Sequence, residues 1–280
     1  MCTPNNRRSA LAAVLLATAA TAPVAAQVRF FPDVRSFEYP IGTAAASGIV
    51  GRLVNTSRGE TAYGNEREAD VSVGENFPVL GFGSGPAPFF LGMTLRVGAR
   101  FSLDDPRSAL ISNEWVAGVH GVMDRGPWRI AAELYHESSH LGDEYAERFQ
   151  RRRVDWTREV ATLWVRRALG SFSASASGSY TLIDALPLSR GAVGAGVDYR
   201  GRLGRLGGSV VTPVAGVFAE ALGYADWDVT TTARAGLEVG GDRGRMGVSM
   251  VFLDGQSTMR QFYDRRSRYV GVELRFELGR

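Results

Sequence analysis

Apolar and polar side chains alternate in short blocks almost to the end of this 280-residue chain. In residues 91–101 every odd position is apolar, whereas the even positions hold glycine, threonine or arginine. The same alternation recurs in 172–182 and in 270–278. A period of two is the period of a β-strand, because successive side chains point to opposite faces. Blocks of about ten residues with one apolar face are typical of strands that cross a membrane as a closed barrel.

Turn-forming residues divide the chain into twelve such blocks. The sequence therefore predicts an all-β fold, a single transmembrane antiparallel β-barrel of about twelve strands. The predicted strands are 43–53, 67–77, 90–102, 111–123, 128–139, 154–167, 171–183, 189–200, 208–219, 228–240, 244–254 and 267–278. Tight turns alternate with long loops, and in such barrels the tight turns are periplasmic. The segment 77–90 fits least well, because it is long for a periplasmic turn.

The first 26 residues are organised like a secretion signal. Arg7 and Arg8 precede a short apolar stretch, and small residues then lead to a predicted cleavage after Ala26. We expect residues 27–42 to form a periplasmic lead-in that can fold into the lumen, and residues 43–280 to form the barrel. The predicted location is the bacterial outer membrane. The expected partners are the surrounding lipid and, during insertion, the barrel-assembly machinery.

The charge balance argues against a nucleic-acid partner. The formal net charge of +3 falls to +1 once Arg7 and Arg8 are removed, since 3 − 2 = 1, whereas nucleic-acid-binding domains carry a concentrated basic patch. Charges of both signs are instead interleaved on the polar side of the strands. A channel selective for ions would carry rings of one sign, so the pattern favours a network that fills the lumen. The predicted lumen residues are Arg96, Arg100, Glu114, Arg129, Glu133, Arg234, Glu238, Glu273 and Arg275.

Residues 135–144, Y-H-E-S-S-H-L-G-D-E, hold two of the three histidines and stand apart in composition. One interpretation is a zinc protease, because 136–140 match the motif H-E-x-x-H. That motif works on a helix, where both imidazoles share a face and the glutamate acts as general base. On a strand the two histidines would lie about 13 Å apart, too far to share one zinc ion.

A second interpretation is a hydrolase acting on lipid. His136 and Ser138 occupy the apolar side of the predicted strand 128–139, so they would face lipid near its outer end. Neighbours on one face can share a hydrogen bond, with Ser138 as nucleophile and His136 as base. The pair resembles the His-x-Ser arrangement of outer-membrane phospholipase A and of the lipid A deacylase barrels, where a third polar residue orients the histidine. Asp143, Glu144 and Glu159 are candidates for that role, and Asp143 is included in the predicted site.

A third interpretation is that these polar side chains only mark the wet interface at a strand end. Gly142 would then open a loop, and Asp143 would cap its backbone. No cofactor is expected, and the weaker alternative is a calcium ion held by Asp143 and Glu144.

A wider resemblance covers most of the chain after the leader. Its landmarks are E-N-F-P at 75–78, the stretch 135–144, V-D-Y-R at 197–200 and Q-F-Y-D at 261–264. These resemble a bacterial envelope family known as domain of unknown function 1207. Its central pattern, H-x-S-S-H-L-G-D-E, leaves position 137 free, which weakens the zinc interpretation. The resemblance implies an outer-membrane barrel without an assigned activity. Two functions stay open: a non-enzymatic envelope protein, structural or a narrow pore, and a lipid acyl esterase. The oligomeric state is not predicted.

Overall fold

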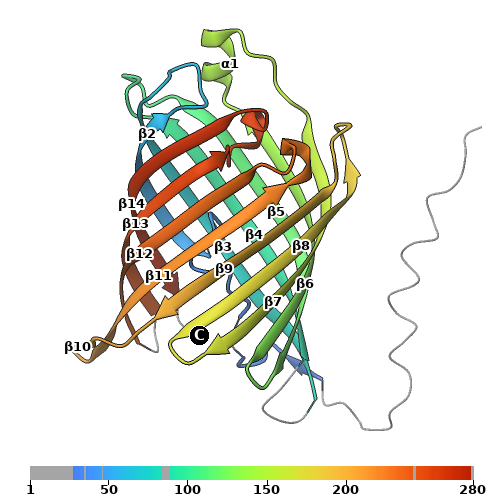
Figure 1. The fold of residues 1–280 in the computed structure, drawn as a ribbon, viewed down its shortest axis with the longest axis vertical. Coiled ribbons are helices and arrows are strands. Elements are labelled where there is room, and N and C mark those ends of the chain that lie inside the picture. Colours follow the sequence, from blue (N-terminus) through green and yellow to red (C-terminus); the bar gives the residue numbers. More distant parts are fainter. Residues whose placement is uncertain (1–27, 35, 46, 84–88, 242–243, 279–280) are drawn as a thin grey trace, which may run out of the picture.

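The computed structural model describes residues 28–34, 36–45, 47–83, 89–241 and 244–278. The predicted secretion signal, 1–26, lies outside the described residues. Within them, twelve long strands form one closed antiparallel barrel, which confirms the predicted fold class (Figure 1). These strands are β2 (Gly48–Arg58), β3 (Arg67–Phe82), β4 (Phe89–Ser102), β5 (Leu110–Arg125), β6 (Trp128–Leu141), β7 (Trp156–Leu169), β8 (Phe172–Asp184), β9 (Gly191–Arg200), β11 (Ser209–Leu222), β12 (Val229–Gly241), β13 (Gly244–Gln256) and β14 (Arg266–Leu278). The shorter elements are β1 (Arg29–Phe30), α1 (Asp143–Phe149), β10 (Gly204–Leu206), η2 (Gly223–Ala225) and η3 (Arg260–Phe262).

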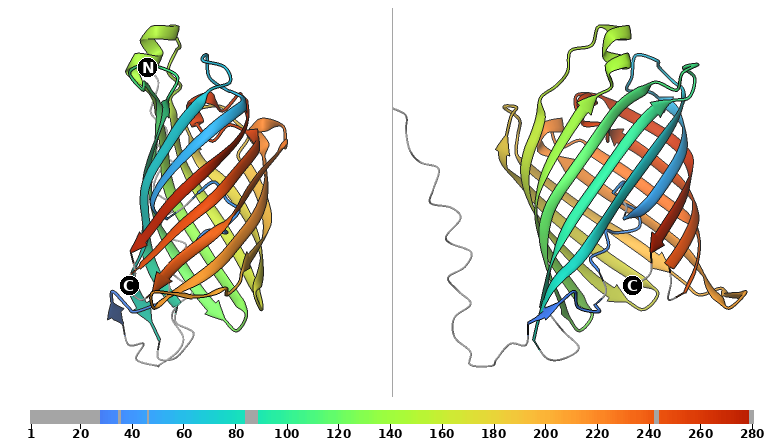
Figure 2. Two further views of the ribbon diagram at one scale, coloured as in Figure 1. Left: turned by 90° about the vertical axis from the view of Figure 1, so that its left-hand side faces the viewer. Right: turned by 180° about the vertical axis from the view of Figure 1, so that it is seen from behind.

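Each long strand pairs with the long strands before and after it, and β14 pairs with β2 to close the sheet. β10 only extends the connection between β9 and β11, which pair directly. The strands are strongly tilted against the barrel axis in both views of Figure 2, as closure of a sheet requires. No helix within the described part of the chain is long and apolar enough to span a bilayer.

The two ends of the barrel differ in the length of their connections. Gly126–Pro127 joins β5 to β6, and Gly170–Ser171 joins β7 to β8. Gly126 has φ +58° and Gly170 has φ +66°, the left-handed conformation that two-residue hairpins use. The connection that carries α1 lies at the opposite end, at the top of Figure 1, whereas the connection through β10 lies at the end of the short hairpins. By the usual rule for these barrels, the long connections are extracellular.

The alternation of apolar and polar residues along each strand places apolar side chains on the outer wall and polar side chains in the lumen. On β4, Leu95 is 44% exposed on the outer wall, whereas its neighbour Thr94 is 2% exposed in the lumen. Large aromatic side chains are exposed toward both ends of the wall, with Trp128 and Phe172 at the short hairpins and Trp115 nearer the long loops. This arrangement matches an apolar band flanked by aromatic girdles, the surface that a barrel presents to lipid.

Two predicted strand limits are wrong. The first strand begins at Gly48 rather than at residue 43, because Thr43 belongs to a turn in which its hydroxyl donates to the carbonyl of Pro40 over 2.8 Å. The segment 77–90 is mostly strand rather than turn, since β3 continues to Phe82 and β4 begins at Phe89.

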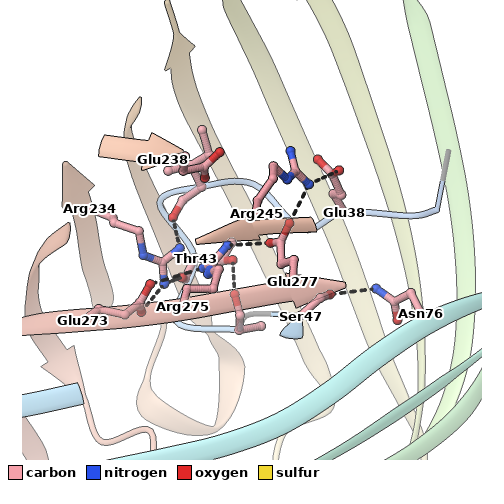
Figure 3. Close-up of polar contacts among 12 residues, drawn as sticks. Glu38, Thr43, Ser47, Asn76, Arg234, Glu238, Arg245, Glu273, Arg275 and Glu277 are labelled. Atoms are coloured by element: carbon pink, nitrogen blue, oxygen red, sulfur yellow. Dashed lines mark hydrogen bonds and ion pairs between the residues drawn. The ribbon is translucent and has the colours of Figure 1, made fainter. Parts of the chain in front are cut away.

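Residues 36–45 lie inside the barrel rather than below it (Figures 1 and 2). Phe37 and Ile41 are 4% and 5% exposed, and Phe37 packs with buried side chains of β4, β5 and β6. Arginines of the wall hold the backbone of this segment: Arg129 donates to the carbonyl of Ser36 over 3.0 Å, and Arg234 donates to those of Ile41 and Thr43. We call residues 36–45 the lumen segment. Figure 3 shows Glu38 and Thr43 of this segment among the charged side chains of the wall.

The outer end of the lumen is covered by the loop 257–265, which contains η3. Met259 and Phe262 of this loop are buried against Ile111, Leu141 and Tyr145. A cavity of about 240 Å³ lies between the two coverings, lined by Tyr39 of the lumen segment on one side and Arg260 of the loop on the other. The lumen is thus obstructed twice along its length.

We expect the intact protein to conduct no ions across a planar lipid bilayer, because the two obstructions lie in series. Deletion of residues 36–45, or replacement of residues 258–263 by two glycines, should leave it closed. Only the combined variant should give steady currents. Faster migration of unboiled than of boiled protein on a denaturing gel would establish that each variant is folded. Steady conductance of the wild type, or a folded combined variant that stays closed, would contradict this arrangement.

Candidate functional site

His136 and Ser138 lie on the outer wall of β6. The burial pattern of this strand places the odd positions from Ala131 to Leu141 in the interior, so that these two residues point outward. Across the ladder, His136 pairs with Glu159 of β7, and Ser138 pairs with Thr157 of the same strand. On the other side, β5 places Trp115 opposite Ser138. The structure therefore gathers a small polar group on an otherwise apolar wall.

The imidazole of His136 is hydrogen-bonded to the carboxylate of Glu159. Nδ1 lies 2.8 Å from Oε1, and the two side chains are 41% and 38% exposed on the outer wall. A carboxylate can only accept a hydrogen bond, so Nδ1 carries the proton in this contact. In the neutral ring this leaves the lone pair on Nε2, the state required of a general base.

The ladder is irregular next to Glu159. The register between β7 and β8 shifts between Glu159 and Val160, so that Glu159 faces Ile183 and Val160 faces Thr181. A bulge of this kind twists the strands locally and re-aims side chains, and bulges are frequent beside active sites. The register shift thus lies next to Glu159, the carboxylate that is hydrogen-bonded to His136.

Ser138 follows His136 by two residues on the same face, a separation of about 7 Å along the strand. Its hydroxyl makes no hydrogen bond within the described part of the chain. Three residues separate it from the end of β6 at Leu141, or about 10 Å of strand. The group therefore lies in the outer part of the wall.

The structure does not bring Asp143 into this group. The chain leaves β6 at Leu141 and turns into α1, whose first residue is Asp143. Its side chain is 85% exposed and forms an ion pair with Arg153. Glu144 is also exposed on the first turn of α1. Of the three carboxylates considered from the sequence, Glu159 is the one that contacts the histidine.

The residues of H-E-x-x-H lie on a strand, as the argument against a zinc protease assumed. Glu137 points into the lumen, where it is 8% exposed and accepts a hydrogen bond from Trp156 Nε1 over 2.8 Å. It is therefore on the opposite side of the wall from His136 and His140. Within the described residues, no group of three or more potential ligands is placed to hold a metal ion.

The lumen holds a dense network of charges. Glu273 accepts from Arg52 over 2.6 Å and from Arg234 over 3.0 Å, and each of these three side chains is at least nine-tenths buried. Arg100 similarly binds Glu68 over 2.9 Å and Asp70 over 3.0 Å. Figure 3 shows Arg234 of β12 close to Glu273 and Arg275 of β14. A buried ion requires such partners, because leaving it unpaired in a low-dielectric interior is costly.

The remaining predicted lumen residues have partners as well. Glu133 accepts from Tyr39 and from Trp164, each over 2.8 Å. Glu114 accepts from the hydroxyl of Ser139 over 3.0 Å and from the backbone of Arg260. The other pairs are Arg129 with Asp124, Glu238 with Arg200, Arg275 with Glu273 and Glu277, and Arg96 over the ring of Tyr39.

Sequence reasoning missed several members of this network. Glu68 and Asp70 follow the same alternation and could have been found from it. Arg260 could not have been found in this way, because it lies in the loop 257–265, where no strand period applies. It forms an ion pair with Glu137 over 3.4 Å.

The extracellular loops are held together by α1. The hydroxyl of Tyr145 accepts a hydrogen bond from the backbone of Ala62 over 2.7 Å, which ties α1 to the loop 59–66. Arg148 forms an ion pair with Asp105 in the loop 103–109. The backbone N–H of Arg107, followed by the charge of Arg148, lowers the pKa of Asp105 below its usual value. The helix is thus fixed over the outer mouth.

Comparison with known proteins identifies the family. A family described as "Protein of unknown function (DUF1207)" matches residues 53–278. The chain belongs to this family. No curated protein matches the chain.

Among solved structures, the chain is similar to outer membrane phospholipase A from Escherichia coli, with TM-score 0.55 and 13% identity over 86% of this chain and 94% of that one. It is equally similar to the Salmonella typhi outer membrane phospholipase, solved as a dimer with bound calcium, with TM-score 0.55 and 12% identity over 87% and 93% of the two chains. The KdgM porin matches with TM-score 0.44 and 10% identity over 81% and 98%. At such identities the likeness shows the fold alone, that of an outer-membrane β-barrel.

Replacement of Glu273 by alanine should destabilise the barrel strongly, because Arg52 and Arg234 would lose the carboxylate that they share. We expect the free energy of unfolding to fall by about 3–5 kcal/mol, measured by urea unfolding in phospholipid vesicles. Val272→Ala removes two methylene equivalents at the neighbouring outward position and should cost no more than about 1.6 kcal/mol. A loss at Glu273 no larger than that at Val272 would contradict the importance of the shared ion pair.

Proposed function

We propose that this protein is a lipid acyl hydrolase, with Ser138 as nucleophile, His136 as general base and Glu159 as the residue that orients the base. The observation that carries the proposal is the 2.8 Å hydrogen bond between His136 Nδ1 and Glu159 Oε1 on the outer wall. Nucleophile, base and orienting carboxylate are the three parts that activate a serine in otherwise unrelated hydrolases.

The position of the group supports a catalytic role because polar side chains are costly there. A hydroxyl, an imidazole and a carboxylate on a lipid-facing wall lose hydration unless they bond to one another or meet the headgroup layer. Before this group the outward face of β6 follows the usual rule, with Leu134 45% exposed, whereas after it His140 is polar near the end of the strand. The exception is therefore local and coincides with the His136–Glu159 contact.

The chemistry follows from the protonation of His136. As Ser138 Oγ adds to the carbonyl carbon of an ester, Nε2 takes the hydroxyl proton, and Glu159 stabilises the imidazolium through Nδ1 without taking a proton itself. Collapse of the tetrahedral intermediate breaks the bond to the alcohol oxygen, which receives the proton from Nε2. Water then adds to the acyl-serine with His136 again as base, and the fatty acid leaves.

The location of the group points to lipids of the outer leaflet, either phospholipid or the acylated sugar of lipopolysaccharide. The site opens sideways on the wall rather than into the lumen, so an acyl ester can reach it from the bilayer. The solved phospholipase structures with TM-score 0.55 share the fold and are consistent with such a use of it. A pore is not proposed, because the lumen segment and Met259 of the outer loop occupy the lumen.

We expect purified protein to release fatty acid from mixed micelles of phospholipid or lipopolysaccharide, assayed with and without calcium. Ser138→Ala and His136→Ala should each lower the rate by at least about 10³-fold. Glu159→Gln should lower it by roughly 10–10³-fold, because the amide no longer fixes the tautomer of His136.

His140→Ala provides the matched control. His140 is the next outward-facing histidine on the same strand, and it has no place in the proposed relay. Its replacement should leave the rate unchanged. No release by the wild type in either lipid, or equal rates in the Ser138 and His140 variants, would leave the non-enzymatic envelope role as the better account.

A further inference from the structure

A second pocket lies at the extracellular mouth, apart from the proposed hydrolase site. It has a volume of about 630 Å³ and lies between the loop 59–66, α1 with the chain that follows it, and the loop 257–265. None of His136, Ser138 and Glu159 lines it. The pocket and the proposed hydrolase site are therefore separate.

Arginines dominate the lining of this pocket. Arg58, at the end of β2, is exposed and makes no ion pair within the described residues. Arg265 is 58% exposed, and its Nε lies 3.6 Å from the carboxylate of its neighbour Asp264. Arg266 also lines the pocket, but it is engaged by Asp228 over 2.9 Å. Arg58, whose charge also acts on Asp254, and Arg265, whose one carboxylate contact is long, thus keep guanidinium donors for an anion.

Two buried polar atoms in the same lining lack partners within the described residues. Arg151 donates through Nη2 to the carbonyl of Gln261 over 2.9 Å, and Nη2 lies 3.8 Å from the carboxylate of Asp264, whereas its Nε has no acceptor. Glu60 is 6% exposed; its Oε1 accepts from Ser257 over 3.2 Å, and its Oε2 has no donor. Unsatisfied groups of this kind cost free energy when buried, so they indicate where a ligand would bind.

These groups together specify an unusual ligand. The arginines and the free Nε of Arg151 require an anionic group, whereas Glu60 Oε2 requires a hydrogen-bond donor. Phe149 adds an aromatic ring to the wall. A simple anion satisfies the arginines but is repelled by Glu60. A sugar that carries a phosphate or carboxylate group offers an anion, hydroxyl donors and a C–H face in one molecule.

We propose that this pocket binds an acidic sugar, either phosphorylated or carboxylated. The volume suits one or two sugar rings. The pocket opens on the extracellular side, where such sugars can come from the core of lipopolysaccharide or from free solutes. Both sources offer the same chemistry, so the experiment must separate them.

The test is isothermal titration calorimetry on the full-length barrel in detergent micelles. The probes are glucose 6-phosphate, glucuronate, glucose, inorganic phosphate and the core oligosaccharide released from lipopolysaccharide by mild acid. We expect the acidic sugars to bind and glucose not to bind. Binding of the core oligosaccharide together with the small acidic sugars indicates that both sources are accepted. Binding of the oligosaccharide alone still supports an acidic-sugar site and assigns it to lipopolysaccharide.

Variants decide whether the pocket is the site. The combined change Arg58→Ala and Arg265→Ala should weaken binding by about tenfold, because two charge-assisted contacts are lost. Arg152→Ala is the matched control, since Arg152 is an exposed arginine of the same loop region that does not line the pocket. Unchanged binding in the combined variant, or binding of no acidic probe by folded protein, would overturn the proposal.

Glu60→Gln distinguishes a sugar site from a simple anion site. The change removes the repulsive charge but keeps the volume and an acceptor for Ser257. Binding of glucose 6-phosphate should weaken, because a hydroxyl loses its charged acceptor, whereas binding of inorganic phosphate should strengthen. If both strengthened, or if inorganic phosphate bound the wild type as tightly as glucose 6-phosphate, the sugar assignment would be wrong.

Discussion

The lipid around the barrel is the constraint on which the rest of the structure depends. A charge facing acyl chains is costly, by about 2–4 kcal/mol for an arginine at the midplane, so the arginines and glutamates of the long strands point inward. Once inside, each must find a partner. Arg52 and Arg234 share Glu273, and each also donates to a backbone carbonyl of the lumen segment. The ion-pair network that neutralises the inward-facing charges therefore also holds residues 36–45 in place and fills the lumen.

Glu159, His136 and Ser138 are polar side chains on the lipid-facing wall, where such groups are costly. Hydrogen bonding between His136 and Glu159 offsets part of the cost of their position, and the nearby end of β6 brings them close to the headgroup layer. Because paired strands hold both residues in register, the geometry of the group is set by the rigid wall and not by a loop. The proposed hydrolase site is open only from the side, which would restrict its substrates to molecules in or near the membrane.

The sequence was sufficient for features that depend on local periodicity. The alternation along β6 assigns His136 to the outer wall and Glu133 to the lumen without knowledge of any other strand. The sequence left the partner of His136 open among Asp143, Glu144 and Glu159, because the register between β6 and β7 depends on how α1 and its flanking chain take up residues 142–155. Proximity in sequence favoured Asp143, which the helix carries away from the site. The sequence predicted that residues 27–42 can fold into the lumen, but not where they lie there, because arginines from strands distant in the sequence hold the segment.

Reaction with a fluorophosphonate tests the central claim most directly, because such a reagent modifies only a serine that a neighbouring base activates. The folded barrel, labelled in micelles and digested for mass spectrometry, should carry a single adduct on Ser138. The adduct should disappear in the His136→Ala variant, while faster migration of the unboiled protein confirms that the variant is folded. Absence of any adduct on folded wild-type protein, or an adduct on Ser138 that persists without His136, would contradict the proposed relay.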